Sequence, residues 1–175
     1  MVSVLSRVNR SFWLGAWLAW AAFVPTAMAD WAQSGITQEE AVAFMSELGS
    51  AMSRCDINWV ETHMAPEISM TFIIQWPERT ETRVPSRTEY VKFMRQSCQQ
   101  LWMRPSFSKI NYSITAGEYG ATASGRWDKG SGGPPLSSVW NLKMDSAEET
   151  TTLTRGWDGT VYITNVYSVV VPQPK

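Results

Sequence analysis

His63 is the only histidine of the chain and the first group to consider for acid–base chemistry. It lies one helical turn after Trp59 and two turns after Asp56, and Glu67 follows four residues later. An imidazole that a carboxylate orients can take up and release a proton near neutral pH. A half-exposed, hydrogen-bonded histidine with a structural role fits the same residues, and we favour that interpretation. If the protein does have acid–base activity, His63 is the one residue that we name as a catalytic candidate.

Other kinds of catalytic site lack the residues that they need. A zinc site requires three or four protein ligands, and one histidine with no free cysteine pair supplies too few. The nucleophile motif Gly-x-Ser-x-Gly is missing, and the glycines within 130–133 lack the Lys-Ser/Thr ending of a phosphate loop. No Asp or Glu falls in the middle of an alternating strand that the sequence indicates. We expect no metal and no cofactor, and we favour a protein that is not an enzyme.

Aromatic residues suggest a binding site instead. The chain contains 10 tryptophans, and seven of them follow residue 29. Some of these rings will simply be core, but aromatic side chains from different strands of a curved sheet can also line an apolar pocket with a few polar tips. We expect such a lining to be nearly free of ionisable groups. The predicted ligand-binding residues are Trp59, Trp76, Tyr112, Tyr119, Trp127 and Trp140.

Residues 1–29 have the features of a cleavable signal peptide. Arg7 and Arg10 provide a positive start, residues 12–24 are apolar, and Ala27-Met28-Ala29 offers a cleavage site. The apolar run is shorter than the ~20 residues that a membrane span needs, so we favour cleavage over an uncleaved anchor. The sequence predicts an exported protein, periplasmic or secreted, with one domain at residues 30–175 and no membrane contact after cleavage.

The net charge of residues 30–175 bears on the class of partner that the domain can bind. The 16 acidic residues all remain while 13 of the 15 basic ones do, so the formal charge is 13 − 16 = −3. The basic residues are scattered, and nucleic acid is therefore not an expected partner.

In an exported protein the even cysteine count favours a disulfide between Cys55 and Cys98; a buried free pair is the alternative. The two cysteines are too far apart in the sequence to form a redox-active Cys-x-x-Cys motif.

The pattern of apolar residues predicts three helices followed by a run of strands. Thr37 and Glu40 form a capping box that opens the first helix, Asp56 can cap a second, and Ser86 with Glu89 opens the third. Residues 68–76 alternate with a period of two, as in a strand. Strands are also indicated between residues 107 and 171, with Asp158-Gly159 as a hairpin turn. Helices grouped beside an antiparallel sheet define an α+β fold.

This order of elements resembles the nuclear transport factor 2-like superfamily, which includes ketosteroid isomerase and the SnoaL-like polyketide cyclases. The resemblance covers about residues 36–170. It implies a cone-shaped, curved antiparallel sheet wrapped around three helices, with a mostly apolar interior. The segments that carry it are His63-Met64-Ala65-Pro66-Glu67-Ile68, Ser86-Arg87-Thr88-Glu89-Tyr90, Glu118-Tyr119-Gly120-Ala121-Thr122-Ala123, Thr152-Leu153-Thr154-Arg155 and Asp158-Gly159-Thr160-Val161-Tyr162-Ile163-Thr164.

Three functional hypotheses follow, and fold alone does not choose among them. The favoured one is a non-catalytic module that binds a small apolar or aromatic molecule or a protein partner. The second is an isomerase, dehydratase or cyclase that uses His63 with a nearby carboxylate. The third is a structural homodimer joined through the sheet, with Tyr162, Val166 and Val170 in the contact, because the last strand is apolar on both faces.

Overall fold

The computed structural model describes residues 35–99, 112–128, 134, 136, 142 and 144–173. The predicted signal peptide and Trp140 lie outside these residues. Three helices and six strands are described, and their bounds are α2 (Gln38–Arg54), α3 (Ile57–Thr62), β1 (Met64–Trp76), β2 (Arg79–Arg83), α4 (Arg87–Gln99), β3 (Tyr112–Gly117), β4 (Gly120–Asp128), β5 (Met144–Arg155) and β6 (Val161–Pro172).

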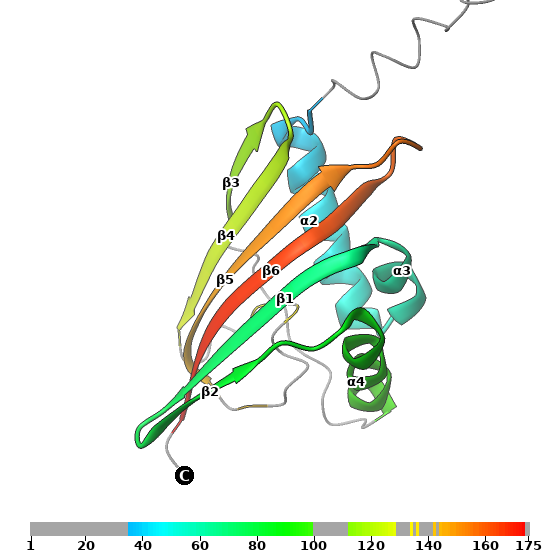
Figure 1. The fold of residues 1–175 in the computed structure, drawn as a ribbon. Coiled ribbons are helices and arrows are strands. Elements are labelled where there is room, and N and C mark those ends of the chain that lie inside the picture. Colours follow the sequence, from blue (N-terminus) through cyan, green and yellow to red (C-terminus); the bar gives the residue numbers. More distant parts are fainter. Residues whose placement is uncertain are drawn as a thin grey trace, which may run out of the picture.

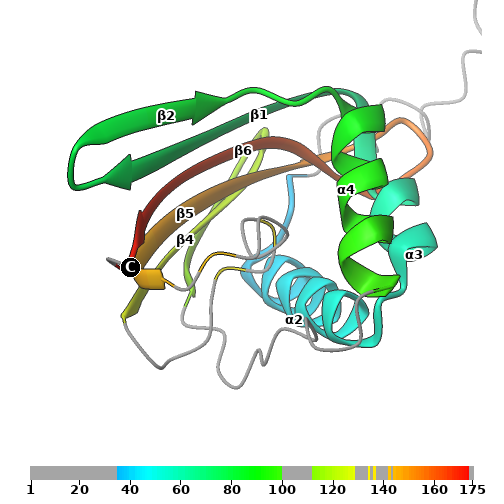
Figure 2. The same ribbon diagram turned by 90° about the horizontal axis from the view of Figure 1, so that it is seen from below.

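The six strands form one curved sheet in the order β2-β1-β6-β5-β4-β3. Every neighbouring pair is antiparallel except β1 and β6, which run parallel, so the sheet is mixed. The helices lie on the concave side, with α2 along the sheet and α3 and α4 together beyond one end of it (Figures 1 and 2). The predicted α+β cone is confirmed, with a mixed sheet in place of the fully antiparallel one that was expected.

Both capping boxes form where the sequence places them. The Thr37 hydroxyl accepts a hydrogen bond from the backbone N–H of Glu40, and the Glu40 carboxylate accepts one from the backbone N–H of Thr37. Ser86 and Glu89 repeat this exchange before α4. Arg155, at the end of β5, forms an ion pair with Glu40 at 2.7 Å. The first turn of α2 is therefore tied both to its own cap and to the sheet.

The hydrophobic core lies between the concave face and the helices. Alternate residues of β1 point into it, as the period of two predicts, and meet the buried faces of α2 and α4. The most deeply buried large side chains include Met45 and Leu48 of α2, Phe72 of β1 and Tyr90 of α4. The rings of Phe72 and Tyr90 stack with centroids 5.8 Å apart. This contact holds α4 against the sheet.

The predicted disulfide is present. The sulfur atoms of Cys55 and Cys98 are bonded, and the two Cα atoms are 5.7 Å apart. Cys55 ends α2 in a left-handed conformation with φ 58°, and its backbone N–H donates to the carbonyl oxygens of Ala51 and Met52 in the last turn of that helix. The bridge therefore links the end of α2 to the last turn of α4. No helix among the described residues is both long and apolar enough to cross a bilayer.

A β-bulge in β6 changes which side chains face the interior. The register of β5 against β6 shifts between Thr152–Asn165 and Leu153–Ile163, which leaves Thr164 as the extra residue. An extra residue reverses the alternation beyond it. Val166 and Val170 consequently lie buried on the concave face, and the prediction that they form a dimer contact is wrong. A contact through the convex face would use Tyr162 and the exposed Tyr167 instead, and the homodimer itself stays a prediction.

Gly120 is required by the backbone at the start of β4. Its φ is 149°, a value that residues with a side chain rarely adopt, and an added Cβ would overlap the carbonyl oxygen of Leu153. We expect Gly120→Ala to lower the free energy of unfolding by about 2 kcal/mol. Gly117→Ala in the same hairpin is the control, because its Cβ would meet the nearest atom at an ordinary 3.6 Å. Urea denaturation of both variants checks the prediction, which fails if the two lose the same stability.

Candidate functional site

A row of five residues crosses the concave face at one level. Sheet register places Phe72 beside Ser168, Ser168 beside Glu149, Glu149 beside Gly125, and Gly125 beside Tyr112. Partners in a register share one face of the sheet, so these residues all face the helices. The row brings one carboxylate and two hydroxyl groups into the interior.

Glu149 is the ionisable residue at the centre of this row. It is 1% exposed, and its Oε1 accepts a hydrogen bond of 3.0 Å from the Tyr112 hydroxyl group. Their Cα atoms are two strand spacings apart, about 10 Å, and the residue between them is Gly125. Because glycine has no side chain, the phenol and the carboxylate can meet above it. Trp127 packs edge-on against Tyr112, with ring centroids 5.2 Å apart, and so helps to fix the phenol.

The environment of Glu149 keeps two tyrosines neutral. Burial raises the pKa of Tyr112 well above its usual value of 10, and the charge of Glu149 and its hydrogen bond raise it further. The pKa of Tyr90 is raised in the same way, first by complete burial and then by the charge of Glu149. Tyr90 donates its hydroxyl proton to the backbone oxygen of Leu136 at 2.5 Å. Both phenols therefore act as hydrogen-bond donors.

A fourth polar group, the side chain of Thr151, lies two residues after Glu149 on the same face of β5. Thr151 is fully buried, and its hydroxyl group has no hydrogen-bond partner. Ser168, also fully buried, is different because it donates to the backbone oxygen of Glu148 at 3.0 Å. We call Tyr90, Tyr112, Glu149 and Thr151 the inner polar cluster.

The inner polar cluster corrects the expectation that no carboxylate lies within the interior face of a strand. The sequence indicates strand, or one interrupted strand, at residues 139–144 and 150–155, which leaves Glu149 in the gap, whereas β5 runs from Met144 to Arg155 and includes Glu149. Its alternate residues Ala147, Glu149, Thr151 and Leu153 are all buried. Extending the alternation backwards from Leu153 would have placed Glu149 on this face. The acidic pair Glu148-Glu149 hides the signal because it looks like a solvated turn.

The raised pKa values give a testable alkaline transition. A group whose pKa is higher in the folded state contributes stability below its unfolded pKa, here about 10, and that contribution is lost as the pH rises through the folded pKa. We expect Tyr90 and Tyr112 to ionise later than a free tyrosine when tyrosinate absorbance is followed with rising pH. Tyr112→Phe should remove one late-ionising group while the native circular dichroism is kept. An unchanged late phase in that variant would contradict the assignment.

The residues predicted to bind a ligand do not all come together. Tyr112 and the buried Trp127 lie in and beside the row. Trp76 lies at the far end of β1, next to the turn into β2. Tyr119 is 84% exposed in the turn between β3 and β4, because the hairpin closes with Gly117 opposite Gly120. The binding role of each of these residues stays a prediction.

His63 and Trp59 form an aromatic pair at the end of α3. Their rings stack with centroids 4.0 Å apart, and Phe44 packs against both. The Nδ1 atom of His63 lies 2.7 Å from the backbone oxygen of Trp59, so it carries a proton and donates it. Asp56 instead caps α3 by accepting a bond from the backbone N–H of Trp59, and Glu67 is exposed. Neither carboxylate orients the imidazole, which supports a structural role for His63.

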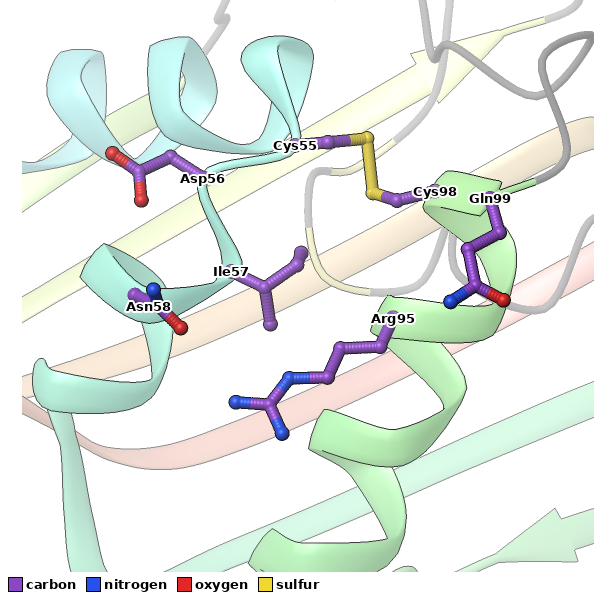
Figure 3. A pocket seen from close by; sticks show the side chains of 7 residues that line it. All are labelled: Cys55, Asp56, Ile57, Asn58, Arg95, Cys98 and Gln99. Carbon is purple, nitrogen blue, oxygen red and sulfur yellow. A yellow bond between two sulfur atoms is a disulfide. The ribbon is translucent and has the colours of Figure 1, made fainter.

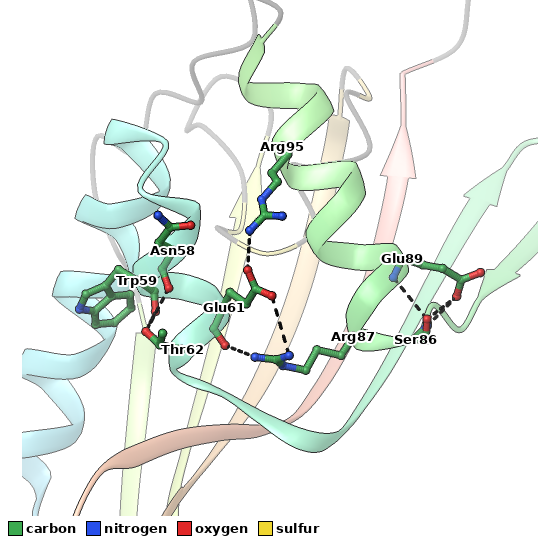
Figure 4. A network of polar contacts seen from close by, with 8 residues as sticks. All are labelled: Asn58, Trp59, Glu61, Thr62, Ser86, Arg87, Glu89 and Arg95. Atoms are coloured by element: carbon green, nitrogen blue, oxygen red, sulfur yellow. Dashed lines mark hydrogen bonds and ion pairs between the residues drawn. The ribbon is translucent and has the colours of Figure 1, made fainter.

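A polar cleft lies outside the cone, between α3 and α4. One part, of about 290 Å³, lies beside the disulfide (Figure 3), and a second part of about 240 Å³ shares Arg95 and Gln99 with it. Glu61 forms ion pairs with Arg95 at 2.6 Å and with Arg87 at 3.9 Å (Figure 4). The charges in this cleft thus largely satisfy one another, and they link α3 to α4.

Within the part of the chain that the structure describes, no group of three or more His, Cys, Asp or Glu side chains is placed to hold a metal ion. The inner polar cluster offers one carboxylate and three hydroxyl groups. This arrangement can bind a polar group of a ligand by hydrogen bonds, and a carboxylate next to a neutral phenol can also accept and return a proton.

Solved structures with a similar fold include nuclear transport factor 2-like proteins. One of unknown function from Pseudomonas putida KT2440 superposes with a TM-score of 0.52 at 13% identity, covering 75% of this chain and 84% of that chain. Another, described as having a cystatin-like fold, from Novosphingobium aromaticivorans, gives a TM-score of 0.50 at 12% identity, with 76% and 80% covered. No protein-family model and no curated protein sequence matches the chain.

Proposed function

We propose that this chain, which has the nuclear transport factor 2-like fold, is an exported protein whose cone binds a small, mainly apolar molecule at the inner polar cluster. The observation that carries the proposal is the buried Glu149 carboxylate, which accepts a hydrogen bond from Tyr112 on the concave face. A buried carboxylate is costly to keep, and a few convergent polar groups on an otherwise apolar lining are typical of small-molecule sites.

Two features of the chain support export. Residues 1–29 have the composition of a signal peptide. The Cys55–Cys98 bridge is of a kind that persists in oxidising compartments and is rare in the cytosol. Mass determination of the protein recovered from the medium or the periplasm tests this part of the proposal, and a chain that still begins at Met1 would contradict cleavage.

A titration with cyclohexanol tests binding in the cone. Trp127 packs on Tyr112, so its indole N–H signal in nuclear magnetic resonance spectra should move saturably as the alcohol is added. Glu149→Gln should weaken binding about tenfold, because the hydrogen bond that positions Tyr112 loses its charged acceptor.

Glu148→Gln provides a matched control on the same strand. Glu148 is exposed on the opposite face and pairs with Arg126 at 3.2 Å, so this change should leave cyclohexanol binding intact. Native mass spectrometry of the purified protein would also detect a co-purifying molecule. A Trp127 signal that does not respond to the alcohol, together with a mass that shows no bound molecule, would reject the proposal.

Proton transfer is a second candidate function, and Glu149 rather than His63 is the residue that favours it. A carboxylate held among neutral phenols can remove a proton from the carbon next to a carbonyl group, while a phenol stabilises the enolate oxygen. The C–H bond breaks as the carboxyl O–H bond forms, and the proton returns in the reverse step. Isomerases, dehydratases and cyclases use such a transfer.

Hydrogen–deuterium exchange of cyclohexanone in heavy water separates the two candidates. Under proton transfer the protein should accelerate deuteration next to the carbonyl group, Glu149→Gln should abolish the acceleration, and His63→Ala should retain it. Deuteration at the uncatalysed rate, with cyclohexanol still bound, would leave binding without catalysis. If His63→Ala abolished the acceleration and Glu149→Gln did not, His63 would be the base that removes the proton.

A further inference from the structure

The Thr151 hydroxyl group is a buried polar group that makes no hydrogen bond within the folded chain. The residue is fully buried, and its Oγ1 atom has no hydrogen-bond partner. Buried hydroxyl groups in native proteins nearly always have a partner, because desolvation without one is unfavourable. Thr151 points to the concave face between Glu149 and Leu153.

The neighbouring strand has small residues beside this hydroxyl group. Sheet register places Gly125 beside Glu149, Ala123 beside Thr151 and Ala121 beside Leu153. These three residues of β4 project little or nothing into the cone, so β4 places no bulky side chain beside Thr151. Ala121 and Ala123 are themselves buried in the core together with residues of α2. A molecule that reaches the hydroxyl group therefore has to enter between β4 and α2, against the apolar surface of the alanines.

We propose that Thr151 is a specificity-determining residue that hydrogen-bonds the ligand of the cone, and that this ligand is an uncharged, mainly apolar molecule with a hydroxyl group. The inference rests on the proposed function. A ligand hydroxyl can accept a hydrogen bond from Thr151 or donate one to it, whereas an isosteric methyl group leaves Thr151 unsatisfied. A ligand carboxylate would face the buried charge of Glu149 and is rejected.

Three probes of one ring size test the inference: cyclohexanol, methylcyclohexane and cyclohexanecarboxylate. Binding is measured from the Trp127 indole signal of the purified protein. We expect the protein to bind cyclohexanol about tenfold more tightly than methylcyclohexane, and to bind the carboxylate more weakly than either. Thr151→Val, which keeps the shape and removes the hydroxyl, should abolish the preference for the alcohol. Thr151→Ser should retain it.

Thr150→Val is the matched control, since Thr150 is the next residue and faces the opposite side, where it pairs with Ser124 at 3.2 Å. It should keep the preference for the alcohol. A preference that survives in Thr151→Val, or a wild-type protein that binds the alcohol and methylcyclohexane equally, overturns the inference but leaves binding in the cone intact. A wild-type protein that binds none of the three probes, and whose native mass shows no bound molecule, removes the proposed function as well.

Discussion

Replacement of both Cys55 and Cys98 by serine is expected to lower the free energy of unfolding by about 4 kcal/mol. The bridge spans a sequence separation of 43, and a crosslink of this length removes much of the conformational freedom of the unfolded chain. Domains of this size are stable by only about 5–15 kcal/mol, so the loss is a large part of the total. Urea denaturation followed by circular dichroism measures it.

Chemical reduction is the control for this prediction. The wild-type protein in a reducing agent should unfold at the same urea concentration as the double serine variant, because the two share the missing crosslink. Serine keeps the left-handed cap of α2 at residue 55 available, so the cap should survive in both. A double variant within 1 kcal/mol, roughly, of the oxidised protein would show that the bridge adds little.

Phe72→Ala is expected to cost about 4 kcal/mol of unfolding free energy. Phe72 is fully buried, and its ring lies between the sheet and Tyr90 of α4, with centroids 5.8 Å apart. The change removes the apolar contact and leaves a void at the end of the row, beside Ser168. It should also loosen α4 and thereby weaken cyclohexanol binding.

Ile73→Ala is the control for the loss of a large side chain from β1. Ile73 is the next residue, lies on the opposite face and is only partly buried, so we expect a cost of about 1 kcal/mol. Urea denaturation curves of Phe72→Ala and Ile73→Ala, measured under the same conditions, compare the two losses of unfolding free energy. Equal losses would mean that the interior face contributes no more than the outer one, contrary to the packing described above.

The helices, the disulfide and β1 could be predicted from the sequence because their signals are local. Each capping box joins residues three apart, and the buried side chains of β1 alternate without interruption from Met70 to Ile74. Cysteine pairing needed only the even count and the expected compartment. The closing hairpin at Asp158-Gly159 was likewise marked by its turn residues.

The candidate site was largely missed because it depends on partners from other strands. Glu149 becomes an interior residue only when the full length of β5 is known, and Gly125 matters only because it lies between Glu149 and Tyr112 in the register. The bulge at Thr164 reversed the faces of β6. An extra residue of this kind is fixed by pairing with the neighbouring strand, and the sequence of β6 alone does not mark it.

The parallel pairing of β1 with β6 has a consequence for how the chain folds. Residues 69–74 pair with residues 165–170, so the centre of the sheet joins segments 96 residues apart in sequence. Contacts of such high contact order slow folding, because a long loop must close before they form. During synthesis, the hairpin of β1 and β2 cannot join the other four strands of the sheet until β6 leaves the ribosome. The C-terminal strand thus sets the moment at which the domain becomes compact, and deletion of β6 should leave no folded core.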